Sequence, residues 1–259
     1  RKESSAASDV YKRQVISFCQ DEFLAKKGVL NESIVSTELG LKGIPNISES
    51  INLYRDIEIL RYSGGKIHIP YVTTSMGVDL IREAKKNNLD ITASVSLAHI
   101  TFSEKDIPEF DTNYKLIPPL RSESDLNSLK EGLVDGTLDY LTSMHEPFDI
   151  DNKKIVFDNA SSGSIGLESM FGLMSNQFTL EKTIDILTRK KIIFEVDDHP
   201  IEIGSLADLS LFNPDKNYNF SENHILSTSK NCAFIDSKHK GIVYGSINGK
   251  NFRLNKLWT

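Results

Sequence analysis

The sequence predicts an α/β protein built on a parallel sheet and followed by a small β module. Short apolar runs rich in Ile and Val alternate with longer segments whose apolar residues recur at helical spacing, which is typical of βαβ units. After Pro200 the pattern changes to short runs bounded by Gly, Asn and Asp. We therefore expect two parts, a partial barrel over residues 15–199 and a C-terminal β module over residues 200–259.

The first predicted elements are a short strand and a long helix. Residues 15–19 are predicted to form a short apolar strand, and the passage after it, up to Pro45, is rich in Gly and contains Pro. A helix is expected to open at Ser48 and Glu49, because apolar residues then recur at helical spacing. Gly64 and the glycine after it should end that helix.

Residues 66–97 predict one complete βαβ crossover. Residues 67–72 and 91–96 have the composition of buried strands. Between them, Thr74 or Ser75 is suited to cap a helix that ends at the Asn87-Asn88 pair. Strands joined in this way are parallel.

The pattern continues with a helix over residues 124–133, a turn at Asp135-Gly136 and a strand that ends at Met144. Further helices are expected over residues 165–174 and 179–189.

The C-terminal β module is expected to contain strands over residues 201–204, 207–212 and 242–247. A turn at Asn248-Gly249 should follow the last of them.

Composition excludes several classes of function. The 259-residue chain has a formal net charge of −6, so no excess of Lys and Arg exists to neutralise a nucleic-acid backbone. No apolar run approaches the roughly 18 residues of a membrane span. The two cysteines, Cys19 and Cys232, are far apart and form no metal-binding pattern, so we expect a reduced, cytoplasmic protein.

Residues 1–14 do not share the periodic pattern that begins at Val15. They have the appearance of translated sequencing-adapter sequence, so we interpret them as a non-native leader and the chain as an N-terminally truncated fragment. An incomplete barrel would leave open sheet edges, and we expect such a fragment not to fold by itself.

One segment is similar to a specific family motif. Residues 114–122 read Tyr-Lys-Leu-Ile-Pro-Pro-Leu-Arg-Ser, which resembles the Tyr-Lys-x-Asn-Pro-Pro-Leu-Arg-Ser of dihydroorotases, in the amidohydrolase superfamily. Supporting matches occur in the same order at residues 41–46, 132–139, 163–169 and 204–214. The resemblance implies the C-terminal part of a TIM-type (β/α)8 amidohydrolase barrel plus a small β module.

The resemblance also implies a chemistry that the matching positions do not support. Dihydroorotases interconvert dihydroorotate and carbamoyl aspartate with zinc, held by histidines and carboxylates at strand ends, and with an aspartate that carries the proton. Five positions where the family places its site residues are apolar or aromatic here, namely Phe18, Tyr71, Ile117, Met144 and Phe148. Phe18 and Tyr71 replace histidines, and Met144 replaces the aspartate. We therefore expect no catalytic residue and no metal site.

Three polar residues are candidates for a residual pocket: Lys115, Arg121 and His145. Arg121 could bind a carboxylate of a ligand, or it could pair structurally with Asp135 or Asp139.

The other histidines have simpler interpretations. We expect His68 to be a hydrogen-bonded core residue and His99 to lie near the mouth of the barrel. The remaining ones fall in predicted loops and are expected to be solvated: His199, His224 and His239.

Three functions stay open. The first is a catalytically silent dihydroorotase homologue that serves pyrimidine biosynthesis as a scaffold or regulatory partner. The resemblance suggests aspartate transcarbamoylase as the partner, and a homo-oligomer. The second is an active dihydroorotase with an unrecognised site, and the third is a small-molecule binder. Because catalysis needs ligands and a base, the substitutions favour the first or third hypothesis.

Overall fold

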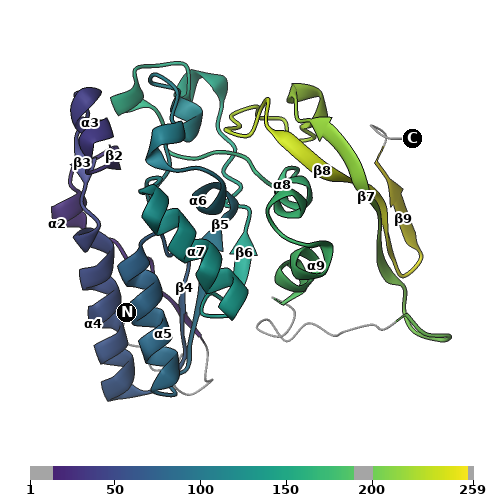
Figure 1. Ribbon diagram of the computed structural model, residues 1–259, viewed down its shortest axis with the longest axis horizontal. Coiled ribbons are helices and arrows are strands. Elements are labelled where there is room, and N and C mark those ends of the chain that lie inside the picture. Colours follow the sequence, from purple (N-terminus) through teal and green to yellow (C-terminus); the bar gives the residue numbers. More distant parts are fainter. Residues whose placement is uncertain (1–13, 190–200, 256–259) are drawn as a thin grey trace.

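A four-stranded parallel sheet forms the centre of the protein, as the sequence predicts (Figure 1). This computed structural model describes residues 14–189 and 201–255. The strands lie in the order β1-β4-β5-β6. Their bounds are β1 (Val15–Ile16), β4 (Ile67–Ile69), β5 (Ile91–Ser96) and β6 (Tyr140–Thr142). The sheet is open, as expected for part of a (β/α)8 barrel.

Helices α4 (Ile47–Ser63), α5 (Ser75–Lys86) and α7 (Glu123–Asp135) cover one face of this sheet (Figure 1). Their ends follow the local sequence. The Thr74 hydroxyl accepts a hydrogen bond from the Gly77 N–H at 3.0 Å and so caps α5. Gly64 and Gly136 end α4 and α7 at positive φ, which glycine adopts without a steric cost.

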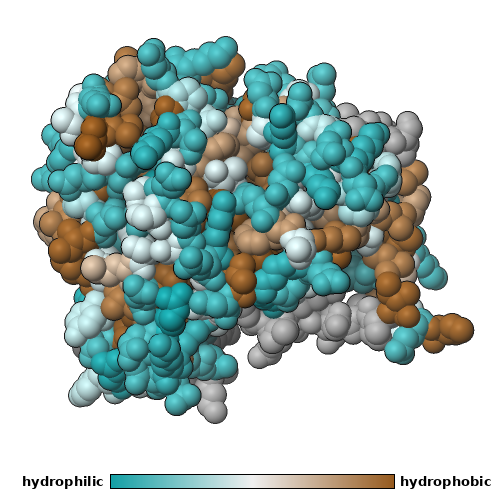
Figure 2. All heavy atoms as spheres, viewed as in Figure 1, coloured by the Kyte–Doolittle hydropathy of each residue, from teal (hydrophilic) through white to brown (hydrophobic). Residues whose placement is uncertain are grey.

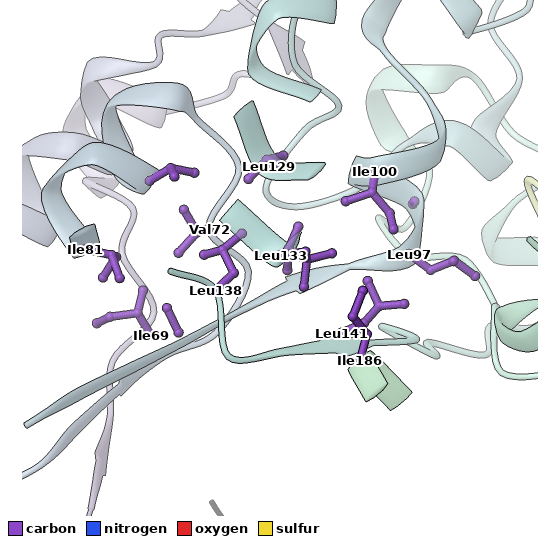
Figure 3. Packing of buried hydrophobic residues seen from close by; sticks show 14 of the residues in the cluster. Ile69, Val72, Ile81, Leu97, Ile100, Leu129, Leu133, Leu138, Leu141 and Ile186 are labelled. Atoms are coloured by element: carbon purple, nitrogen blue, oxygen red, sulfur yellow. The ribbon is translucent and has the colours of Figure 1, made fainter. Parts of the chain in front are cut away.

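The hydrophobic core lies between the sheet and these helices (Figure 3). Ile69 and Leu141 point from the strands toward Ile81 of α5 and Leu133 of α7, and all four are almost completely buried. Burying each such side chain is worth roughly 1.5–3 kcal/mol. This packing fixes the strands, and therefore the positions of the loops at their ends.

The opposite face of the sheet is polar. His68 of β4 is paired in register with Thr92 of β5, and Ser94 of β5 is paired with Tyr140 of β6. Because side chains alternate along a strand, these four residues share the face that the helices do not cover. We call them the His68 cluster.

Small elements occupy the passage between β1 and α4, where the sequence predicts no regular structure. They are α2 (Glu22–Ala25), β2 (Leu30–Asn31), α3 (Ile34–Glu38) and β3 (Gly43–Ile44), with β2 and β3 paired in parallel. Figure 2 shows apolar surface at this edge of the molecule, over α3 and the start of α4, where Ile34 and Ile47 are exposed.

Short helical segments follow β5 and β6. They are α6 (Leu97–Thr101), η1 (Glu104–Asp106), η2 (Thr112–Tyr114), η3 (Ile150–Asn152) and η4 (Phe157–Asn159).

The C-terminal β module is an antiparallel sheet in the order β7-β8-β9, with α8 and α9 between it and the barrel part (Figure 1). The bounds are α8 (Met170–Gln177), α9 (Leu180–Thr188), β7 (Asp208–Asn219), η5 (Glu222–His224), β8 (Lys238–Asn248) and β9 (Asn251–Leu254). The predicted turn at Asn248-Gly249 joins β8 to β9.

Two predictions of secondary structure are wrong. The helix expected over residues 165–174 begins only at Met170, because the backbone before it pairs elsewhere: the Ile165 N–H donates to the Asn231 carbonyl at 2.8 Å. Residues 201–204 form a turn rather than a strand, with the Ser205 N–H donating to the Glu202 carbonyl. The leader at residues 1–13 and the junction at residues 190–200 lie outside the described residues, so the domain boundaries remain predictions. Within the described ranges, no helix is long and apolar enough to cross a membrane.

Candidate functional site

The loops that follow the parallel strands meet at the carboxyl edge of the sheet, where α/β barrels carry their functional groups. The loops after β4 and β6 hold two of the substituted positions, Tyr71 and Met144. Both have positive φ, at 58° and 46°. This conformation costs an ordinary side chain roughly 1 kcal/mol and must be held in place by its surroundings.

Met144 is buried, with 4% of its surface exposed, and its N–H donates to the Thr142 hydroxyl at 3.2 Å. A thioether is at best a weak hydrogen-bond acceptor and cannot take up a proton near neutral pH. The position therefore has the backbone geometry of a strand-end site without a group that could act as a base.

Glu146 and Phe148 lie next to Gly163, and Glu146 is close enough to Tyr71 to affect its ionisation. A Cβ atom at Gly163 would lie 2.6 Å from both the Glu146 Oε2 and the Phe148 Cε2. Burial, and then the Glu146 carboxylate, raise the pKa of the Tyr71 hydroxyl. Burial also raises the pKa of Glu146. Glu146 is thus a carboxylate at the sheet edge that sequence reasoning missed, because it lies between two substituted positions without a recognisable motif.

The other two substituted positions, Phe18 and Ile117, are exposed by 45% and 39%. Ile117 precedes a cis peptide bond to Pro118, which shapes the loop after η2. Neither a phenyl ring nor an aliphatic side chain can bind a metal or move a proton.

His68 is fully used by hydrogen bonds, as the sequence predicts. Its Nδ1 lies 2.9 Å from the Thr92 hydroxyl, and its Nε2 lies 2.9 Å from the Tyr140 hydroxyl and 3.3 Å from that of Ser94. Its ring also stacks on Tyr140, with centroids 5.3 Å apart. Burial lowers the pKa of His68, so the ring is a neutral member of the His68 cluster.

His99 does not face the mouth of the barrel as an available group. It is 2% exposed, and its Nε2 donates to the Pro118 and Pro119 carbonyls at 3.0 and 3.2 Å. Its Nδ1 therefore accepts from the Ser96 hydroxyl at 2.6 Å. Burial lowers the pKa of His99 to about 4.

His145 is placed at the sheet edge, next to Met144, and is paired with Ser164 in an isolated β-bridge. Its Nδ1 lies within 3.4 Å of the Gly166 and Leu167 N–H groups and 3.9 Å from the Glu168 carboxylate. Of the three candidate pocket residues, it is the one whose ring is partly open to solvent, with 24% of the side chain exposed.

Lys115 is held by backbone carbonyls rather than left free for a ligand. Its ammonium group donates to the carbonyls of Phe157 and Asp158 at 2.8 and 2.9 Å. Lys153 nearby is held in the same way, with its ammonium group donating to Thr112, Ser161 and Gly163. The two lysines fix the long loop that follows β6.

Arg121 is buried in a polar network that joins several loops. Its guanidinium donates to the Asn31 side chain at 2.8 Å, to the Ile44 carbonyl at 2.7 Å and to the Thr73 hydroxyl at 3.3 Å. The predicted pairing with Asp135 or Asp139 is wrong. Asp135 pairs instead with Arg82 of α5, and Asp139 pairs with Lys85 of the same helix.

Glu49 completes this network and was not predicted to have any role beyond opening a helix. Its carboxylate accepts hydrogen bonds from both the N–H and the hydroxyl groups of Thr73 and Thr74. We call these residues, with Arg121 and Asn31, the Glu49 network. It anchors the loop after β4, which carries Tyr71.

The expectation of solvated histidines in the C-terminal part is wrong for His239. It lies within β8, is 1% exposed and stacks on Phe220 with centroids 4.8 Å apart. Burial lowers its pKa to about 4. His224 is half-buried in η5, and His199 lies outside the described residues.

The donor groups at the sheet edge do not fit the zinc that the resemblance implies. Zinc sites in proteins use imidazole, thiolate and carboxylate ligands, and His68 and His99 have both ring nitrogens occupied by hydrogen bonds. Over residues 14–189 and 201–255, no three or more His, Cys, Asp or Glu side chains are grouped so as to hold a metal ion. The absence of a metal from the whole protein remains a prediction.

The chain is clearly related to known proteins. It is 36% identical over 256 residues to a dihydroorotase of Caldanaerobacter subterraneus, and 35% identical over 243 residues to one of Thermoanaerobacter, covering 95% and 90% of this chain. The chain is a homologue of dihydroorotases. No protein-family model matches it. It spans 59% and 56% of the length of these two relatives.

Solved structures support the fold of this dihydroorotase homologue. An L-hydantoinase of Arthrobacter aurescens superposes on 96% of the chain with a TM-score of 0.81 at 17% identity, and the matched region is 59% of that protein. Over the matched region the structure thus shares the fold of that protein, with a parallel sheet and a small β module, and the predicted α/β fold class is confirmed.

Proposed function

We propose that this dihydroorotase homologue serves pyrimidine biosynthesis without catalysing the dihydroorotase reaction, as a scaffold or regulatory subunit. The observation that carries this proposal is the chemistry of the strand ends. Phe18, Tyr71 and Met144 offer no zinc ligand or base where the resemblance places them, while the Glu49 network that supports the loops is intact.

The Glu49 network holds the loops in one arrangement, which favours a role for the surface or the shape of the protein. We infer that the surface is used for assembly, in a homo-oligomer or with a transcarbamoylase, inside the cytoplasm.

The decisive experiment uses the full-length protein. We expect less than a tenth of an equivalent of zinc after purification in zinc-containing medium, and no turnover of dihydroorotate or carbamoyl aspartate above background. A catalytic relative purified in parallel provides the positive control. Stoichiometric zinc together with turnover would establish the active alternative.

The scaffold role has a separate test. Affinity-tagged full-length protein should copurify with aspartate transcarbamoylase from the source organism and change its sedimentation. A protein that sediments alone, and leaves the transcarbamoylase unchanged, would contradict assembly and favour the small-molecule binder.

A further inference from the structure

A pocket of about 240 Å³ is lined by residues of α8 and of the C-terminal β module, where no function has been assigned. Its walls combine aromatic rings with one carboxylate. Phe171 of α8 lines one side, Tyr218 and Phe220 line the other, and Glu168 reaches it from the segment before α8. Pockets for drug-sized ligands occupy roughly 300–1,000 Å³, so this one suits a smaller molecule.

Glycines make room for the pocket. A Cβ atom at Gly241 would lie 2.6 Å from the Phe171 ring, and Gly241 also has a φ of 88°. The absence of a side chain there lets the Phe171 ring lie flat against β8. The hollow is therefore built by the close approach of α8 to the sheet, and is not a gap between loosely packed parts.

Glu168 is held in a fixed position. Its Oε1 accepts hydrogen bonds from the N–H groups of Leu226 and Ser227, at 3.1 and 3.0 Å. Its Oε2 lies 3.9 Å from the His145 ring, and only 15% of the side chain is exposed. A fixed carboxylate that is largely removed from water attracts a positive charge more strongly than one at the surface.

The titratable side chains of the lining are those of Glu168, Tyr218 and His224. Among the eleven residues that line the pocket, none is Lys or Arg. An anionic ligand would be repelled by Glu168, and a neutral apolar ligand would remove water from the carboxylate without replacing its hydrogen bonds. An organic cation with apolar substituents can pair with the carboxylate and also contact the rings, since aromatic faces attract cations.

We propose that this pocket binds a small organic cation of the methylated-ammonium class. Glu168 supplies the opposite charge, and the Phe171 and Tyr218 rings contact the methyl groups. Because Glu168 also approaches His145, the ligand would lie beside the loop that carries Met144, and would connect the β module to the sheet edge.

The test is calorimetric titration of the full-length protein with choline. Dimethylbutanol, the uncharged carbon isostere of choline, is the matched ligand control. We expect saturable binding of one choline per chain and at least tenfold weaker binding of dimethylbutanol. Absence of saturable choline binding, or equal binding of the two ligands, would overturn the proposal.

Two pairs of variants locate the site. Glu168→Gln should weaken choline binding at least tenfold, whereas Glu222→Gln, an acidic neighbour outside the lining, should leave it unchanged. Phe171→Leu should weaken it threefold or more, whereas Phe252→Leu on β9 should not. Circular dichroism checks the folding of each variant. If Glu168→Gln does not fold, the Phe171→Leu and dimethylbutanol results decide, and unchanged binding in Phe171→Leu would place the cation elsewhere.

Discussion

The Glu49 network and the Tyr71 and Met144 positions lie around the same loop-bearing edge of the sheet, but their side chains differ in kind. The network consists of charged and hydroxyl groups whose hydrogen bonds run between loops. Tyr71 and Met144 offer a phenol and a thioether in a backbone conformation that is costly for both. The polar groups at this edge hold loops in place, whereas the side chains at the two strand ends cannot bind a metal or take up a proton near neutral pH.

Buried polar groups that support a loop and polar groups that carry out catalysis therefore have different requirements. Support for a loop requires that donors and acceptors within the protein match each other, and the Glu49 carboxylate meets that requirement with the N–H and hydroxyl groups of Thr73 and Thr74. Catalysis requires groups that are accessible to a substrate. The His68 imidazole is not accessible in this way, because hydroxyl groups of its own sheet occupy both ring nitrogens.

Among the variants that test this difference, Met144→Asp is expected to have the largest effect on stability. A carboxylate at a position with 4% exposure would be almost completely removed from water, so we expect a loss of roughly 3–5 kcal/mol in the free energy of unfolding and no gain of zinc binding. Urea unfolding and zinc titration measure the two results. Met76→Asp, at an exposed position of α5, is the control and should cost less than about 0.5 kcal/mol.

Zinc binding by Met144→Asp alone would show that the strand ends still form a metal site. That result would contradict the proposed catalytic silence.

A somewhat smaller loss, about 3 kcal/mol, is expected for Glu49→Gln. The amide group would present N–H donors to the donors of Thr73 and Thr74, leaving buried groups unpaired. Urea unfolding gives the value, and Glu58→Gln, in a surface pair with Arg61, should change it by less than about 0.5 kcal/mol. A loss below about 1 kcal/mol in Glu49→Gln would mean that the network does not support the loop.

The sequence predicts the fold well where the signal is local. Helix α5 follows directly from the Thr74 cap and the apolar spacing after it, and Gly64 and Gly136 mark the ends of α4 and α7. Strands β2 and β3 are missed, because a two-residue strand is too short to show a period.

The site is less predictable, because its contacts join distant residues. Glu49 and Thr73 are 24 positions apart, and nothing in either segment identifies the other as a partner. His239 was expected in solvent because it precedes the apolar run at residues 242–247 from which the strand was predicted. Strand β8 begins earlier, at Lys238, and Phe220 of another segment packs on the His239 ring. The motif resemblance indicates which positions differ from the family pattern. The hydrogen bonds show which polar side chains are used within the protein and so are not available to a ligand.

His99 provides a pH-dependent test of whether its imidazole is closed off. Its pKa is lowered from 6.5 to about 4 in the folded protein, so the unfolded chain binds the proton first as the pH falls. Stability is therefore complete above pH 6.5 and should fall by roughly 2–3 kcal/mol by pH 4 from this residue. His99→Asn should flatten that part of the curve, measured by urea unfolding relative to its own value at neutral pH. An unchanged slope would mean that His99 is accessible to protons, and hence available as a ligand.

The smallest expected effect concerns Lys153, which holds the loop after β6. Burial, and then the charge of Lys115, lower its pKa from 10.5 to about 8. The folded protein therefore releases this proton before the unfolded chain does, and the penalty for the buried charge is complete below pH 8 and is relieved above it. We expect the free energy of unfolding to rise by about 1 kcal/mol between pH 8 and about pH 10 relative to Lys153→Met, which lacks the titrating group. Parallel curves for the two proteins would mean that the ammonium group stays charged throughout, with its three carbonyl partners compensating its burial.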